Sequence, residues 1–169
     1  MALPPPPDGW ARFLIESKFA MGRDFRALDP STEAQVYFVD GKVNVRPVAE
    51  IQGPDGAVIF TVKGQVLAIP KRMAISDAQG QQVAELKAKA FSLVKNRMTL
   101  AFTDGSTWEL TGSFIEKNYS VASKGTPVIQ ITQKWMTIRD RYTIDVAPGI
   151  DPALALALMW AVDRWVERD

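Results

Sequence analysis

The chain has 169 residues and a mass of 18.7 kDa, which is the size of one domain with enough residues to bury a hydrophobic core. Hydrophobic residues make up 47% of the sequence and charged residues 23%, as in an ordinary globular chain. Cysteine and histidine are both absent. Disulfides, cysteine nucleophiles, zinc-finger ligand sets and triads with an imidazole base are therefore excluded. Carboxylate, lysine, tyrosine and serine chemistries remain, but no base, nucleophile or metal set can be assembled from these residues, so we expect no enzyme activity, no cofactor and no metal site.

The net charge of +1 is unevenly distributed along the chain. Residues 57–147 carry twelve Lys and Arg against seven Asp and Glu, whereas the segments before and after them are acidic. A mildly basic middle fits an anionic partner surface. The excess is far smaller than that of a nucleic-acid-binding domain, so we expect no nucleic acid partner.

The first residues are rich in proline, with four in succession at positions 4–7. We expect residues 1–9 to form a disordered leader and residues 10–169 to form one domain. The leader lacks the basic and apolar regions of a secretory signal. The longest uncharged apolar run, 153–162, has ten residues, whereas a membrane-spanning helix needs about 20. The sequence thus predicts a cytoplasmic protein without a transmembrane helix.

From Trp10 to Val146, apolar and polar residues alternate between short turn motifs. Tyr142, Ile144 and Val146, for example, alternate with Thr143 and Asp145, which we expect on a solvated face. A period of two with one polar face is typical of half-buried antiparallel strands.

The alternating region also repeats. Gly56, Gly80 and Gly105 lie 24 and 25 residues apart, and each precedes a predicted strand. This spacing accommodates two strands and two turns, so it predicts hairpin repeats that close into a barrel.

The last segment is of a different kind. Asp151 is a favourable N-cap and Pro152 a favourable first helical residue, so we expect a helix over 152–166. Its first turns are apolar on every side, Trp160 included, and such a helix must be buried all round. The lumen of the barrel is the obvious place for it. Asp163, the first charge after the apolar run, is expected at the barrel mouth, either in a buried polar contact or paired with an arginine.

These features together resemble the LURP-one-related family, which is grouped with tubby C-terminal domains and phospholipid scramblases. The hairpins at 89–100 and 134–144, the Asp-x-x-Gly turns and the closing segment 147–151 before the apolar helix carry the resemblance, over roughly residues 10–166. It implies a mainly β fold: a closed antiparallel barrel of about twelve strands around a central, buried C-terminal helix. Tubby domains bind phosphoinositides and scramblases act on phospholipids. The cysteine-rich segment and transmembrane helix of scramblases are missing here, so lipid translocation is not implied.

In a meander, successive turns alternate between the two ends of the barrel. One end would then carry eight basic residues against only two acidic ones, Asp24 and Asp140, and we call these eight the basic rim. The basic rim consists of Arg23, Arg46, Lys71, Arg72, Lys95, Arg97, Arg139 and Arg141. The turns at the opposite end contain Asp29, Asp55, Asp77, Asp104 and, as the one basic exception, Lys124. Trp135, which follows Lys134, is a candidate for membrane contact, although a place in the core is the commoner role of such a residue.

Two functional hypotheses follow. The first is a non-catalytic domain that binds anionic phospholipid headgroups, or the inner face of a membrane, through the basic rim. The second is a protein-interaction or scaffold module, in which the charged turns serve only solubility. A third possibility, a barrel that binds a small ligand, requires the terminal helix to pack outside the lumen.

Overall fold

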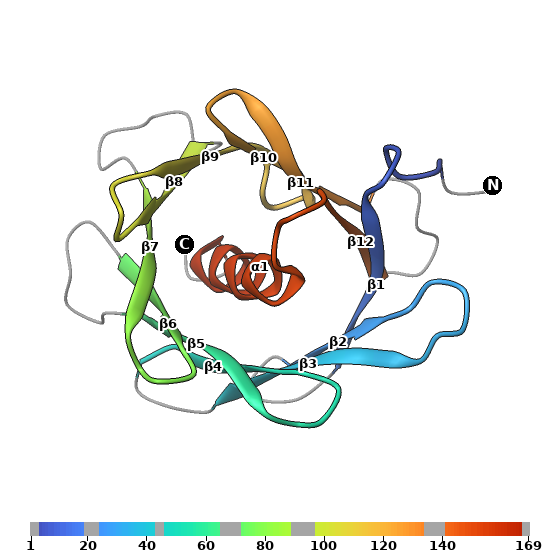
Figure 1. Ribbon diagram of the computed structural model, residues 1–169, viewed down its shortest axis with the longest axis horizontal. Coiled ribbons are helices and arrows are strands. Elements are labelled where there is room, and N and C mark those ends of the chain that lie inside the picture. Colours follow the sequence, from blue (N-terminus) through green and yellow to red (C-terminus); the bar gives the residue numbers. More distant parts are fainter. Residues whose placement is uncertain are drawn as a thin grey trace.

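Strands and tight turns alternate along the chain in the computed structural model, and a single helix follows them (Figure 1). The structure describes residues 4–18, 24–42, 46–64, 72–88, 97–133 and 141–166. The twelve strands are β1 (Ala11–Lys18), β2 (Asp24–Leu28), β3 (Gln35–Lys42), β4 (Val48–Gln52), β5 (Val58–Gly64), β6 (Arg72–Asp77), β7 (Gln82–Ala88), β8 (Arg97–Phe102), β9 (Thr107–Ser113), β10 (Asn118–Ser123), β11 (Thr126–Thr132) and β12 (Arg141–Val146). The helix α1 is Pro152–Val166.

Each strand pairs antiparallel with its neighbour in sequence, and β1 pairs with β12 to close the barrel. In the closing register, Ala11 lies opposite Val146 and Glu16 lies opposite Arg141. Closure leaves no unpaired sheet edge. The expected antiparallel barrel of about twelve strands is confirmed.

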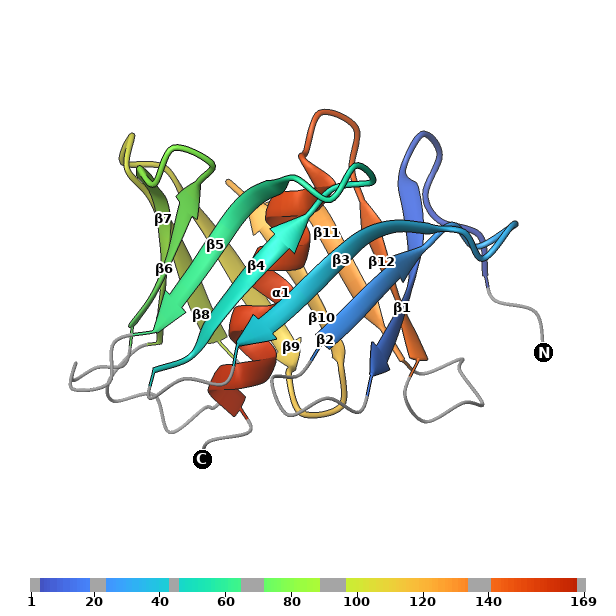
Figure 2. The same ribbon diagram turned by 90° about the horizontal axis from the view of Figure 1, so that it is seen from below.

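Helix α1 runs through the lumen of the barrel (Figures 1 and 2). It begins where predicted: the Asp151 side chain accepts a hydrogen bond of 2.9 Å from the backbone N–H of Ala153, as an N-cap does. Eleven of its fifteen residues are buried, and Trp160 is only 1% exposed. Within the described ranges, no helix has the length and apolar character needed to cross a membrane.

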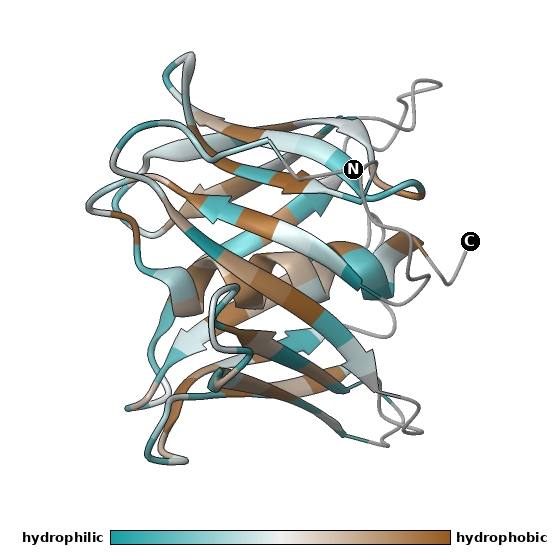
Figure 3. Cartoon of the chain, turned by 90° about the vertical axis from the view of Figure 1, so that its right-hand side faces the viewer, coloured by the Kyte–Doolittle hydropathy of each residue, from teal (hydrophilic) through white to brown (hydrophobic). Residues whose placement is uncertain are grey.

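The strands supply the other half of the core. Both hydrophobic and hydrophilic residues occur along the strands (Figure 3), and the buried apolar residues of the strands belong to one core cluster with those of the helix. The alternation is not strict, since β1 carries Phe13, Leu14 and Ile15 in succession. The helix backbone lies closest to β3–β6. Alanines allow such an approach, and both Ala49 on β4 and Ala157 on the helix are fully buried. A barrel that binds a small ligand would require the helix to pack outside the lumen. Because the helix fills the lumen, this requirement is not met.

The outer face of β12 differs from the sequence expectation. Thr143 and Asp145 alternate with the core residues as predicted, but they are only 2% and 4% exposed. Arg12 of β1 covers Asp145: its guanidinium makes a bidentate contact with the carboxylate, at 2.7 and 2.9 Å. The hydroxyl of Thr143 donates a hydrogen bond of 3.3 Å to the carbonyl of Thr132 on β11. Alternation therefore did not predict that contacts with neighbouring strands bury these polar side chains.

Part of the proline-rich leader lies against the same region. The carbonyl of Pro4 accepts a hydrogen bond from Arg12, and Pro7 accepts one of 3.0 Å from the backbone N–H of Trp10. The segment 4–9 contacts the barrel at these points, and residues 1–3 lie outside the described part of the chain. The disorder of the leader stays a prediction.

Gly112 on β9 is required by a close approach between strands. Its φ is +133°, and a Cβ atom there would lie 2.6 Å from the carbonyl oxygen of Asn118 and 2.7 Å from Cα of Tyr119. Both obstacles are backbone atoms of β10, which cannot move without breaking the β9–β10 pairing. Glycine at this position thus permits β10 to pack closely where Tyr119 enters the core.

We expect Gly112→Ala to lower the free energy of unfolding by about 3 kcal/mol, since strain in φ and overlap with β10 add together. Gly56→Ala is the matched control. Gly56 also has a positive φ, +81°, but nothing lies within 4 Å of its would-be Cβ, so strain alone should cost about 1–2 kcal/mol. Urea denaturation measures both changes, and equal losses in the two variants would contradict the close approach.

Candidate functional site

The two ends of the barrel differ in charge as the order of strands predicts. Odd-numbered strands end, and even-numbered strands begin, at the end where the helix also ends (Figure 2). The four described members of the basic rim lie there: Arg72, Arg97 and Arg141 are the first residues of their strands, and Arg46 precedes β4. The other four, Arg23, Lys71, Lys95 and Arg139, lie outside the described residues, as does Trp135.

The turn aspartates at the opposite end have a structural role. Asp29, Asp55, Asp77 and Asp104 each accept a hydrogen bond from a backbone N–H two residues later, at 2.8–3.0 Å. Hydrogen bonds from Ser31 lower the pKa of Asp29, and those from Ser106 lower the pKa of Asp104. These carboxylates stabilise tight turns, which is the usual role of aspartate there. Asp55, Asp77 and Asp104 leave negative charge at this end of the barrel, whereas the turn of Asp29 reaches Arg141 of the basic rim through Glu33.

The members of the basic rim are not equally available to a partner. Arg46 and Arg97 are exposed, and neither takes part in the ion pairs recorded within the described ranges. Arg72 is also exposed, with its Nε 3.7 Å from Glu85, a carboxylate that Lys87 approaches at 3.8 Å. Among these three exposed arginines, only the charge of Arg72 is partly offset by a nearby carboxylate, that of Glu85.

Arg141, in contrast, forms ion pairs within the protein. Its guanidinium contacts Glu16 at 2.6 Å and Glu33 at 3.0 Å. Glu16 also pairs with Arg26 on its other side, so the carboxylate bridges β12 and β2. Hydrogen bonds from Arg26 and Arg141 lower the pKa of Glu16. Sequence reasoning grouped Arg141 with the other arginines because it could not show this pairing.

The structure adds lysines that the analysis of turns missed. Lys18, Lys42, Lys63 and Lys87 occupy the last or next-to-last positions of β1, β3, β5 and β7. All four positions therefore lie at the basic-rim end, and Lys42, Lys63 and Lys87 are exposed. Lys42 is paired with Asp40 and Glu50, at 2.6 and 3.0 Å. The signal was present in the sequence as a lysine repeated every 21 to 24 residues, one strand end per hairpin.

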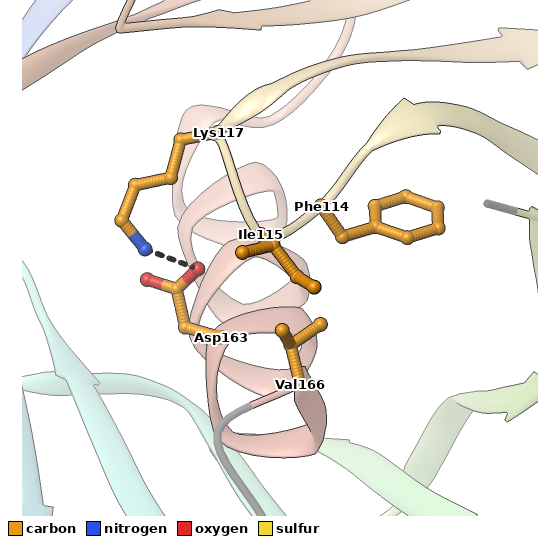
Figure 4. A pocket seen from close by; sticks show the side chains of 5 residues that line it. All are labelled: Phe114, Ile115, Lys117, Asp163 and Val166. Atoms are coloured by element: carbon orange, nitrogen blue, oxygen red, sulfur yellow. Dashed lines mark ion pairs between the residues drawn. The ribbon is translucent and has the colours of Figure 1, made fainter. Parts of the chain in front are cut away.

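A buried ion pair joins the helix to the barrel mouth at this same end (Figure 4). Asp163 is 4% exposed, and its Oδ1 lies 3.0 Å from Nζ of Lys117, in the turn between β9 and β10. The hydroxyl of Tyr142 donates a hydrogen bond of 3.3 Å to Oδ2 of Asp163. The ammonium of Lys117 also lies 5.4 Å from the centre of the Tyr142 ring, a cation–π contact. Asp163 thus stands in a buried polar contact, one of the two alternatives that the sequence left open.

Two tyrosines surround this carboxylate inside the barrel. Burial, and next the negative charge of Asp163, raise the pKa values of Tyr119 and Tyr142 well above the ordinary value of 10. Both hydroxyls therefore stay neutral. The Tyr119 hydroxyl has no hydrogen-bond partner among the described residues. This arrangement does not supply an acid–base catalyst for neutral pH, because such a group needs a pKa near the working pH.

A shallow pocket of about 240 Å³ opens beside the ion pair. Phe114, Ile115 and Val166 form its apolar wall, and Lys117 and Asp163 form its polar wall (Figure 4). It is smaller than the pockets of about 300–1,000 Å³ that hold most small-molecule ligands. Among the described residues, no cluster of three acidic side chains could hold a metal ion.

Comparison with known proteins places this geometry in context. The model of a family described as LURP-one-related matches residues 11–163. A solved structure of a protein from Arabidopsis thaliana has the same fold, with a TM-score of 0.68, 15% sequence identity and coverage of 92% of each chain. No curated protein matches the sequence.

We expect Lys117 and Asp163 to be energetically coupled. In a double-mutant cycle of Lys117→Met and Asp163→Asn, the coupling in the free energy of unfolding should exceed about 1 kcal/mol, because the pair is largely shielded from water. Lys42→Met and Asp40→Asn provide a control pair that is more exposed, with side chains 43% and 28% exposed. That pair should show about 0.2–1 kcal/mol. A coupling for the buried pair no larger than for the control would contradict a role in fastening the helix.

Proposed function

The chain belongs to the LURP-one-related family, and on that premise we propose that it is a non-catalytic domain that docks on anionic phospholipid headgroups through the basic rim. The separation of charge between the two ends of the barrel carries this proposal. Exposed arginines and lysines gather at one end, and the turn aspartates Asp55, Asp77 and Asp104 gather at the other. We place the binding surface at the inner face of a membrane, where anionic lipids are concentrated.

The arrangement favours a surface over a small ligand. Arg46, Arg72 and Arg97 lie at the starts of different hairpins, so they present charge around an end of the barrel and do not converge on one point. The lumen behind them is filled by α1. A broad array of separate cations suits a layer of headgroups, which also offers many separate anions.

The expected strength is modest. Each basic residue near an anionic leaflet contributes about 1 kcal/mol, so three exposed arginines would give weak, reversible attachment. Salt should weaken it, because exposed charges are screened within about 8 Å at physiological ionic strength.

Co-sedimentation with vesicles tests the proposal. The protein should sediment with vesicles that contain phosphatidylserine but not with pure phosphatidylcholine, and less of it should do so as salt rises. Arg97→Glu should weaken binding about thirtyfold, since it removes one attraction and adds one repulsion of about 1 kcal/mol each.

Lys124→Glu is the charge-matched control, because it changes the net charge equally at the opposite end of the barrel. It should leave vesicle binding almost unchanged. Equal losses in both variants would show that net charge alone matters. Absence of binding to any vesicle would refute the lipid hypothesis and favour the alternative, a protein-interaction module.

A further inference from the structure

The turn between β9 and β10 presents an exposed hydrophobic side chain at the basic-rim end. Ile115 is 74% exposed, and it is the one large hydrophobic residue that is exposed among the described residues. The turn occupies residues 114–117 and lies beside the end of the helix (Figures 2 and 4). An exposed isoleucine costs solvation free energy that a polar residue there would avoid.

The residues on either side hold this turn in place. Phe114 is 3% exposed and packs edge-on against Tyr119, with ring centres 5.0 Å apart. Lys117 is fixed by its ion pair with Asp163, and its backbone N–H donates to the carbonyl of Phe114 at 3.3 Å. Lys117 also has a positive φ of 55°, which turns the chain sharply. Ile115 is therefore held at the surface, on the wall of the pocket beside Val166, by a turn anchored in the core.

We propose that Ile115 inserts into the apolar boundary of an anionic bilayer when the basic rim docks on the headgroups. This inference rests on the proposed function and adds a second, apolar contribution to it. Peripheral membrane proteins commonly combine these two contributions, because charge alone gives weak attachment and apolar burial is insensitive to salt. The exposed Arg97, at the start of the adjacent strand β8, belongs to the same end of the barrel.

A bilayer fits this feature better than a protein partner. A stable protein interface buries about 800 Å² on each side and has an apolar centre. Here Ile115 is the one large hydrophobic residue that is exposed among the described residues, and the apolar wall that it forms with Phe114 and Val166 belongs to a pocket of only about 240 Å³. Glu116, next to Ile115, is exposed and charged, so it must remain in the hydrated headgroup layer. Insertion is therefore limited to the one isoleucine, and the expected gain in affinity is about tenfold.

Vesicle binding of Ile115→Ser tests the inference. Because Ile115 is exposed, the substitution should leave the melting temperature unchanged. Binding to phosphatidylserine-containing vesicles should weaken about tenfold, and the loss should persist at physiological salt, where the effect of Arg97→Glu shrinks.

A fluorescent label gives an independent readout of insertion. The chain has no cysteine, so Ile115→Cys creates a single site for an environment-sensitive fluorophore. Gln79→Cys, in the exposed turn between β6 and β7 at the opposite end, is the matched control. Anionic vesicles should shift the emission of the label at 115 to the blue and leave the label at 79 unchanged.

The outcomes separate the two proposals. If the wild type binds anionic vesicles, but Ile115→Ser binds equally well and the label at 115 does not shift, the insertion is refuted and the docking stands. If the wild type does not bind, or if only the label at 79 shifts, both the docking through the basic rim and the insertion are refuted.

Discussion

The structure depends on the burial of a helix that is apolar on every side. An open surface of a globular protein is unfavourable for the segment 153–162, because the face turned to water would expose hydrophobic area whichever way the helix packed. A closed barrel of twelve strands surrounds the helix completely and leaves no sheet edge unpaired. The same helix fills the lumen, so that the interior serves as core. Function is thereby confined to the outer wall and the two ends.

The polar end of the helix links this core to the candidate site. Asp163 is buried and paired with Lys117, and Lys117 in turn shapes the turn that presents Ile115. Meanwhile the meander places the turns that follow odd-numbered strands at this same end. Arg46, Arg72 and Arg97 therefore lie around the mouth of the barrel at which the helix ends. The order of the strands and the direction of the helix thus bring the exposed arginines, the exposed side chain of Ile115 and the turn anchored by Lys117 to the same end of the barrel.

Much of the fold could be predicted from the sequence, because alternation, turn spacing and an all-apolar helix limit the folds that can satisfy them, and the resemblance to a known family supplied the number of strands. The start of α1 at Pro152 and the alternation of turns between two ends follow from such local rules. Contacts between residues that are distant in the sequence do not follow from local rules. The cover of Asp145 by Arg12, the pairing of Arg141 with Glu16 and the pairing of Asp163 with Lys117 depend on the register of closure, which no local pattern specifies. Hence the basic rim could be predicted as a set, but not which arginines remain unpaired.

Native-state hydrogen exchange of the helix amides tests most directly whether α1 is a permanent part of the core. Amides between residues 156 and 162 should exchange only through global unfolding, with the same free energy as urea denaturation gives. This result would confirm that the lumen never opens in the folded protein. Exchange of the helix at a distinctly lower free energy than the strands would show that the helix leaves while the barrel persists. The lumen would then be available to a ligand, which contradicts the account.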